Sequence, residues 1–234
     1  MIDVRIESLL PGAKSAAGTV VIIDVLRAFT TAAVALARGA TKIIMVGSVE
    51  EALALRNSGV GQLCAGEVDG LTPAQFDFGN SPFEASRAHV NGLTIIHRTS
   101  AGTQGIVSAK QASQLYCGSL VTARGTAQAI LHQSPALVTL VAMGDHGVTR
   151  TDEDELCAIH LRNLLEGRAG DSAAIRNVIL AGARIADFHD PSMPHLPPED
   201  LEIALDIDRY DFAVRIDQED GRPVARIERA KRLG

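Results

Sequence analysis

The chain has 234 residues, 46% of them hydrophobic, so it can bury one large α/β core or two smaller ones. Its 28 acidic and 22 basic side chains give a formal net charge of -6, which is the wrong sign for a broad surface that holds nucleic acid or anionic lipid. Aromatic residues make up only 3% and Trp is missing, so we expect no stacking platform for bases or sugars.

The N-terminal region and the cysteines indicate the compartment. No basic region precedes an apolar segment as in a signal peptide, and Asp24 and Arg27 interrupt the apolar stretch 20–36. The three cysteines lie far apart and form no CxxC pair, which argues against a disulfide framework or a zinc knuckle. We expect a cytoplasmic protein without a nucleic-acid or membrane partner, and the sequence is compatible with a homo-oligomer.

Short β-branched runs alternate with Ala-rich segments from residue 20 onward. The expected strands are 20–25, 42–46, 63–65, 93–96, 115–117 and 137–143, and the expected helices are 28–37, 49–56, 120–131 and 156–165. Parallel strands need crossover helices and are buried on both faces. The alternation therefore predicts an α/β fold with a mainly parallel sheet, or sheets, and flanking helices.

An internal likeness suggests two lobes. The segments 21–47 and 116–144 each contain a strand, polar residues, an Ala-rich helix and a second strand that ends in Gly. The alternative is that any two βαβ units look alike at this level. We divide the chain into two similar βαβ-containing lobes, 1–110 and 111–234.

The C-terminal part is predicted from its prolines. Four prolines within 190–198 indicate a loop, because proline cannot donate a backbone hydrogen bond and holds its predecessor extended. A helix is expected from there to about Asp206, followed by a strand at 212–216. We interpret the basic positions from Arg222 to Arg232 as a solvated chain end.

Asp24 and Arg27 lie where the first buried strand gives way to a helix. In open α/β sheets ligands bind at the carboxyl ends of the strands, and a following helix N-terminus favours anions. The alternative for Asp24 is a helix cap, which is a common role for Asp at such a turn. A cap does not need an arginine one turn later, so we expect both side chains to be functional.

A second candidate follows another expected strand. The loop 66–70 holds Glu67 and Asp69 and leads to Asn80 and Ser81. Carboxylate, amide and hydroxyl oxygens form the hard ligand set that suits Mg²⁺. A solvated turn rich in Gly and Asp is the alternative, and the position after a strand favours a site.

A third candidate, 97–105, combines hydroxyl residues and glycines after a strand. Its backbone N–H groups could approach phosphate oxygens closely, and Arg98 could add a bidentate contact. It lacks the terminal Lys of a Walker A loop, so ATP is not implied. An ordinary Gly/Ser turn explains the pattern equally well.

The remaining titratable residues give weaker signals. Four consecutive acids, 152–155, precede the helix expected near Leu156, and the helix dipole alone explains acids at that position. His97 and His146 flank candidate loops and are weak acid/base candidates. The other five histidines show no metal-ligand spacing, and we interpret them as surface or loop residues.

Seven collinear motifs resemble the 2-phosphosulfolactate phosphatase family over nearly the whole chain. They are DVLRAFTT at 24–31, GE at 66–67, FDFGNSP at 76–82, TSAGT at 99–103, GSLVTA at 118–123, EDELCA at 153–158 and DLEIALDIDRYD at 200–211. The resemblance implies a Mg²⁺-dependent acid phosphatase that acts on phosphate esters of 2-hydroxycarboxylic acids, and the named member serves coenzyme M biosynthesis. The family pattern has Gly-Glu-Arg where this chain has Gly66-Glu67-Val68, so a basic group that would meet the anionic end of a sulfonate substrate is missing.

The matching positions are then assigned roles from their chemistry. A phosphate monoester dianion repels nucleophiles, so hydrolysis needs charge neutralisation, an in-line nucleophile and a stabilised leaving oxygen. We expect Asp24, Arg27 and Glu67 to be catalytic. We expect Mg²⁺ ligands at Asp24, Glu67, Glu153 and Asp154. The expected substrate-binding residues are Asn80, Ser81, Arg98, Thr99, Ser100, Gly102, Thr103 and Ser119.

The nucleophile and the reaction class have alternatives. Asp24 either attacks phosphorus directly or orients a water, and the lack of a second Asp two residues on favours water. A non-catalytic phosphometabolite-binding protein would be stabilised by ligand without turnover. A Mg²⁺-dependent lyase on a 2-hydroxy or enol acid would consume substrate without releasing phosphate.

Overall fold

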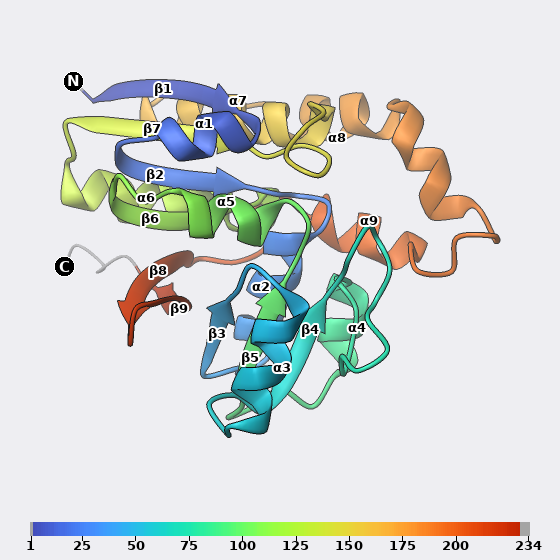
Figure 1. Ribbon diagram of the computed structural model, residues 1–234. Helices are drawn as coiled ribbons and strands as arrows, with labels where there is room; N and C mark the ends of the chain where they lie inside the picture. The colour runs from blue at the N-terminus through green and yellow to red at the C-terminus, as the bar shows by residue number, and fades with distance from the viewer. Residues whose placement is uncertain (1, 230–234) are drawn as a thin grey trace.

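The computed structural model describes residues 2–229 and contains one mixed, mostly parallel nine-stranded sheet flanked by helices (Figure 1). The strand order is β1-β7-β2-β6-β8-β9-β3-β5-β4. The strands are β1 (Asp3–Ser8), β2 (Gly18–Ile23), β3 (Lys42–Met45), β4 (Leu63–Gly66), β5 (Thr94–Arg98), β6 (Ala112–Gly118), β7 (Leu137–Ala142), β8 (Ala213–Glu219) and β9 (Arg222–Glu228). The predicted α/β class is confirmed.

Two parallel blocks make up the sheet. One is β1-β7-β2-β6 and the other is β3-β5-β4, and the antiparallel hairpin β8-β9 joins them by pairing with β6 and β3. Strand β2 of the N-terminal half thus pairs with β6 and β7 of the C-terminal half. The division into lobes near residue 110 stays a prediction.

Helices cover both faces of these blocks. They are α1 (Leu9–Ser15), α2 (Ala28–Ala37), α3 (Val49–Asn57), α4 (Pro82–Arg87), α5 (Gly102–Ser108), α6 (Ala123–Gln133), α7 (Asp152–Leu165), α8 (Ser172–Leu180) and α9 (Pro198–Ala204), with 3-10 turns η1 (Leu120–Thr122) and η2 (Ala183–His189). Among residues 2–229, no helix combines the length and the apolar character needed to cross a bilayer.

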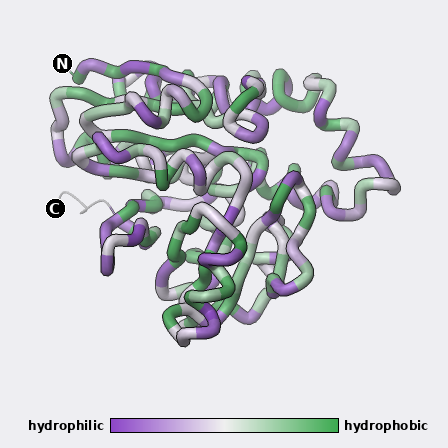
Figure 2. The backbone as a smooth tube through the Cα atoms, viewed as in Figure 1, coloured by the Kyte–Doolittle hydropathy of each residue, from purple (hydrophilic) through white to green (hydrophobic). Residues whose placement is uncertain are grey.

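The alternation of side chains along β2 explains why the strand reads as one continuous apolar run. Val20 and Ile22 pack on the face covered by α1 and α5, whereas Val21 and Ile23 pack on the face covered by α6 and α7. Figure 2 shows the strands of this block among the most hydrophobic parts of the chain. Burial of both faces fixes the carboxyl end of β2, and hence Asp24, at the sheet edge where ligands bind in such folds.

One interpretation of the C-terminal end was wrong. Arg222–Glu228 is strand β9, not a solvated tail, because its apolar residues Val224 and Ala225 are buried between β8 and β3. The arginine side chains of this strand point outward, where Arg226 pairs with Glu219. The predicted tail residues Lys231 and Arg232 lie outside the described part of the chain.

The start of α7 also differs from the prediction. The helix begins at Asp152, four residues before the expected position, so the acidic run forms its first turn. Acids in this turn face the positive end of the helix dipole. As a result Glu153 and Asp154 are placed on a rigid helix and are both buried, at 7% and 2% exposed.

Candidate active site

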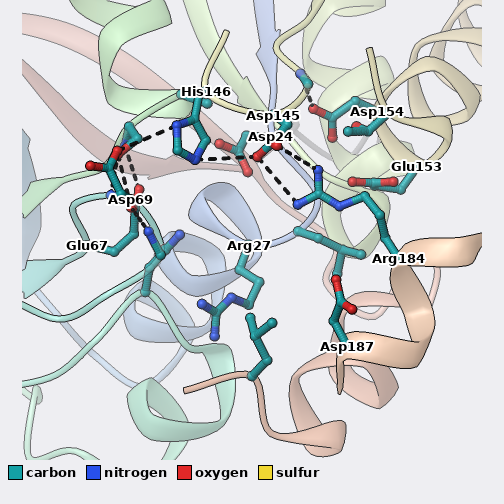
Figure 3. A pocket seen from close by; sticks show the side chains of 18 of the residues that line it. Asp24, Arg27, Glu67, Asp69, Asp145, His146, Glu153, Asp154, Arg184 and Asp187 are labelled. Carbon is teal, nitrogen blue, oxygen red and sulfur yellow. Dashed lines mark hydrogen bonds and ion pairs between the residues drawn. The ribbon is translucent and has the colours of Figure 1, made fainter. Parts of the chain in front are cut away.

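A cavity of about 250 Å³ lies at the carboxyl ends of β2, β4 and β7, and the segment 184–196 closes one side of it (Figure 3). Charged side chains dominate its wall. The lining includes seven carboxylates, two guanidinium groups and two imidazoles: Asp24, Glu67, Asp69, Asp145, Glu153, Asp154 and Asp187; Arg27 and Arg184; His146 and His195. Such a wall recognises a polar, charged ligand rather than an apolar one.

Asp24 is both a cap and a pocket residue. Its Oδ1 accepts a hydrogen bond of 3.0 Å from the Ala28 N–H at the start of α2, and the side chain is only 6% exposed. A Cβ atom at Gly102 would lie 2.8 Å from Asp24 Oδ2, so the glycine leaves room for the carboxylate. Burial, and after it the charges of Glu67 and Glu153, raise the pKa of Asp24 to about 7.

Asp154 joins the loops that follow β2 and β7. Its Oδ1 accepts from the Val25 N–H and its Oδ2 from the Gly144 N–H, each at 2.8 Å. Burial, followed by the charges of Asp24 and Glu153, raises the pKa of Asp154 well above its usual range. Burial also raises the pKa of Glu153. These three carboxylates therefore form one acidic cluster that favours a bound proton or cation.

Glu67 joins the loops after β4 and β5. Its Oε1 accepts from the Ser100 N–H at 2.5 Å, and its Oε2 accepts from the Gly70 N–H at 2.8 Å and the Ser100 hydroxyl at 3.0 Å. Gly66 precedes it with φ 130°, and a Cβ there would overlap the carbonyl of Arg98. The glycine thus permits the close approach of the two strand ends that brings Glu67 to the pocket.

Arg27 is fixed by a buried carboxylate, Asp200, to which the sequence analysis assigned no role. Its Nη1 donates to Asp200 Oδ2 and to the His195 carbonyl, both at 2.7 Å, and its side chain is 6% exposed. Asp200, on α9, is fully buried, and its Oδ1 accepts from the Ser81 hydroxyl at 2.6 Å and the Phe83 N–H at 2.9 Å. Asp200 connects α9 to α4 and to Arg27.

The predicted site residues separate into two groups. The lining contains Asp24, Arg27, Glu67, Asn80, Ser100, Glu153 and Asp154. The other predicted residues lie outside the lining and are Ser81, Arg98, Thr99, Gly102, Thr103 and Ser119. The structure thus brings together seven of the predicted residues from three loops and one helix start.

The residues behind the lining have structural partners. Arg98 donates from Nη1 to the Glu67 carbonyl at 2.7 Å and to the Ser100 hydroxyl at 3.1 Å. Thr99 and Thr103 bond to each other, because each hydroxyl accepts the backbone N–H of the other residue. Ser119 is outside the lining, with its hydroxyl 3.3 Å from that of Thr122. These contacts hold the pocket loops rather than face the cavity.

Two charged residues at the mouth of the pocket, Asp145 and Arg184, were not predicted, and His146 was only a weak acid/base candidate. His146 lies between two carboxylates, with Nδ1 3.5 Å from Asp69 Oδ1 and Nε2 3.6 Å from Asp145 Oδ1. Arg184, on η2, pairs with the same Asp145 (Figure 3). Asp69 and His146 have positive φ values of 51° and 54°, and each directly precedes a glycine, as in the Asp-Gly turns of short hairpins.

Two histidine interpretations can be judged against the structure. His97 is 1% exposed on β5 and does not line the pocket, and burial lowers its pKa to about 4. It is therefore neutral near pH 7. His160 is buried on α7 at 2% exposed, so its assignment to the surface was wrong.

The acidic cluster fits a hard cation by its chemistry. Within residues 2–229, no three His, Cys, Asp or Glu side chains converge as a formed metal-ligand set. The oxygens of Asp24, Glu153 and Asp154 are nevertheless the donor type that Mg²⁺ prefers, and burial together with the charge of Glu153 raises the pKa of both Asp24 and Asp154. The cluster therefore fits Mg²⁺ by its negative charge and by its oxygen donors.

Comparison with known proteins identifies relatives of one kind. A family model described as 2-phosphosulpholactate phosphatase matches residues 4–191. A probable 2-phosphosulfolactate phosphatase from Bacillus subtilis is 29% identical over 212 residues, which are 89% of this chain and 90% of that protein. A protein with the same description from Carboxydothermus hydrogenoformans is 44% identical over 48% of this chain and 46% of that protein. Another from Thermotoga petrophila is 33% identical over 66% of each chain.

Proposed function

This chain belongs to the 2-phosphosulpholactate phosphatase family, a family of phosphoric monoester hydrolases, and we propose that it hydrolyses a phosphate monoester of a small 2-hydroxycarboxylic acid. The observation that carries the proposal is the pocket in which the buried Arg27 and the acidic cluster line one cavity. The proposed substrates include 2-phosphosulfolactate, the compound in the name of the relatives.

The charge of the pocket supports a cation-dependent reaction. Seven carboxylates and two guanidinium groups line the cavity, so a phosphate ester cannot enter unless protons or metal ions neutralise part of this charge. We propose Mg²⁺, held by oxygens of Asp24, Glu153 and Asp154, with Glu67 on the opposite wall. When bound, Mg²⁺ would neutralise charge on the phosphoryl oxygens and on the leaving oxygen.

The chain's own residues have distinct proposed roles. Arg27 presents the nitrogens that Asp200 does not occupy to the phosphoryl oxygens. Asp24, which lines the cavity, orients a water for in-line attack on phosphorus. Glu67 keeps the loops after β4 and β5 together through its three hydrogen bonds. Asn80 and Ser100 offer an amide and a hydroxyl to the rest of the substrate.

The test is release of inorganic phosphate from a panel of phosphorylated 2-hydroxy acids, with and without EDTA. We expect release that EDTA abolishes and that added Mg²⁺ restores. Asp24→Asn should be inactive, whereas Asp206→Asn, which loses only an exposed pair with Arg209, should match the parent chain. Binding without turnover would indicate a phosphometabolite-binding protein, and loss of substrate without phosphate release would indicate a lyase.

The cysteines support a cytoplasmic location. Cys64, Cys117 and Cys157 are all free and buried, as expected in a reducing compartment. Within that compartment we propose that the enzyme acts on a small metabolite, and a role in coenzyme M synthesis applies only where 2-phosphosulfolactate is the ester that it hydrolyses best. Comparing kcat/KM across the ester panel decides this point.

A further inference from the structure

A phosphate ester of a 2-hydroxycarboxylic acid carries a second anionic group, its carboxylate, next to the phosphoryl group. Building on the proposed function, we infer that Arg184 binds this carboxylate and thereby selects acid esters over simple phosphate monoesters. The inference rests on the position of Arg184, on its present partner and on the contacts of the other cations near the pocket.

Arg27 is unsuited to bind both groups. Its Nη1 is occupied by Asp200 and by the His195 carbonyl, at 2.7 Å each, so only its remaining nitrogens face the cavity. Arg27 and Asp24 are each only 6% exposed, and this buried floor of the lining is where the phosphoryl group is proposed to react. A carboxylate on the neighbouring carbon needs a different cation.

Arg184 is the second guanidinium group in the described lining of the cavity. It extends from η2 toward the centre of the pocket, on a different wall from the floor at Arg27 (Figure 3). Its side chain is 53% exposed, so it can adjust to a ligand. The two arginines therefore offer separate contacts for the two anionic groups of one small molecule.

The present partner of Arg184 shows what it can bind. Its Nη1 lies 3.2 Å from Asp145 Oδ2 and its Nη2 lies 3.4 Å from Asp145 Oδ1, so the two nitrogens face the two oxygens of one carboxylate. This two-pronged arrangement is the one by which arginine recognises carboxylates. Asp145 occupies the place that we assign to the substrate carboxylate.

The exchange of one carboxylate for another should cost little. An exposed ion pair contributes little net free energy, and Asp145 is 42% exposed. When Asp145 leaves Arg184, it still has His146 within 3.6 Å as a partner. The substrate carboxylate therefore competes with a weak internal contact.

Other arginines near the pocket have different contacts. Arg98 bonds to the Glu67 carbonyl and to Ser100 and does not line the cavity. Arg150 lies 3.5 Å from Glu155 and is also outside the lining. Val68, which stands where the family pattern has an arginine, is uncharged. Arg184 is therefore the arginine in the described chain that can meet the substrate's acid group.

The test compares two esters in Arg184→Gln and Arg184→Lys. The first ester, 2-phospholactate, has the carboxylate; the second, p-nitrophenyl phosphate, lacks it. For Arg184→Gln we expect kcat/KM to fall about 10–100-fold on 2-phospholactate and to change less than about 3-fold on p-nitrophenyl phosphate. Arg184→Lys should recover only part of the loss, because an ammonium lacks the planar fork.

Arg124→Gln is the matched control, because Arg124 is 62% exposed, pairs with Asp208 and lies outside the lining. It should leave both activities unchanged. An equal loss on both esters in Arg184→Gln, or no loss on either, would overturn the assignment of Arg184.

A binding measurement separates this inference from the proposed function. Calorimetry should show lactate binding weakened at least about 10-fold in Arg184→Gln, with binding of inorganic phosphate unchanged. Absence of phosphate release by the parent chain would refute the phosphatase assignment alone. Unchanged lactate binding in the variant would refute the role of Arg184 whatever the turnover.

Discussion

The buried pair of Arg27 and Asp200 gives the sharpest prediction about stability. Asp200 is fully buried and accepts three hydrogen bonds, from the Arg27 guanidinium, the Ser81 hydroxyl and the Phe83 N–H. In Asp200→Asn the side chain keeps its shape but has one oxygen and one NH₂ group. If the amide oxygen faces Arg27, the NH₂ group faces the N–H of Phe83. If the amide oxygen faces Phe83, the NH₂ group faces the guanidinium. In either case two hydrogen-bond donors oppose each other.

The magnitude follows from this unavoidable mismatch. Breaking a buried ion pair by removing one charge costs about 3–5 kcal/mol, because the other charge remains buried without compensation. That is a large part of the roughly 5–15 kcal/mol by which a typical domain is stable. Burial raises the pKa of Asp200 although the charge of Arg27 lowers it. The loss of hydration therefore opposes the ionised form of Asp200, and Arg27 offsets only part of that cost. Asp200→Asn should therefore be folded but much less stable.

The assay is urea unfolding, with kcat/KM measured on the same samples at low temperature. Asp206→Asn, on the same segment but 55% exposed, should lose less than about 1 kcal/mol. The double variant Arg27→Met with Asp200→Asn should be less damaged than the sum of the single variants, since it removes both buried charges. Stability of Asp200→Asn within about 1 kcal/mol of the parent chain would refute the reasoning.

Two predictions concern the chemistry of the pocket. Arg27→Lys should lose about 10–100-fold in kcat/KM, or roughly 1.4–2.8 kcal/mol of transition-state stabilisation, because one ammonium cannot hold Asp200 and the phosphoryl group together; parent-like kinetics would make the arginine structural. Asp24→Asn should lose most turnover. Acid quench and mass spectrometry of the parent enzyme should find no phosphoryl adduct. A stoichiometric adduct on Asp24 would identify this residue as the nucleophile.

The fold was predictable because its signals are local or follow from burial of both sheet faces. Helix α2 has the predicted bounds, since an Ala-rich segment that directly follows a buried strand has few other solutions. The sheet order was not predictable, because β8 and β9 enter between two parallel blocks through long-range pairing with β6 and β3. Strand β9 reads as a charged tail since its outward positions are occupied by arginine.

The candidate site was predictable where its residues follow strand ends. Asp24 and Glu67 come directly after β2 and β4, and Ser100 follows β5 by two residues, so the parallel topology alone brings them to one edge. Asp200 and Arg184 lie on short helical segments far along the chain, and only the tertiary path of 184–200 brings Arg184 to the pocket and Asp200 to Arg27. No periodicity or spacing in the sequence carries that information.

The acidic cluster also makes a prediction about pH. The pKa of Asp24 rises from the ordinary 3.8 to about 7 in the fold, so between these values the folded chain binds more protons than the unfolded chain. Stability of the metal-free protein should therefore fall as pH rises through this range, by about 4 kcal/mol if Asp24 acted alone. Urea unfolding in EDTA at pH 5 and pH 8 measures the part of this loss above pH 5, about 2–3 kcal/mol. Asp24→Asn should reduce it, Asp206→Asn should not, and Mg²⁺ should restore more stability at pH 8, where protons no longer compete. If Asp24→Asn and the parent lost the same stability between pH 5 and pH 8, the pKa of Asp24 would not be raised in the folded protein.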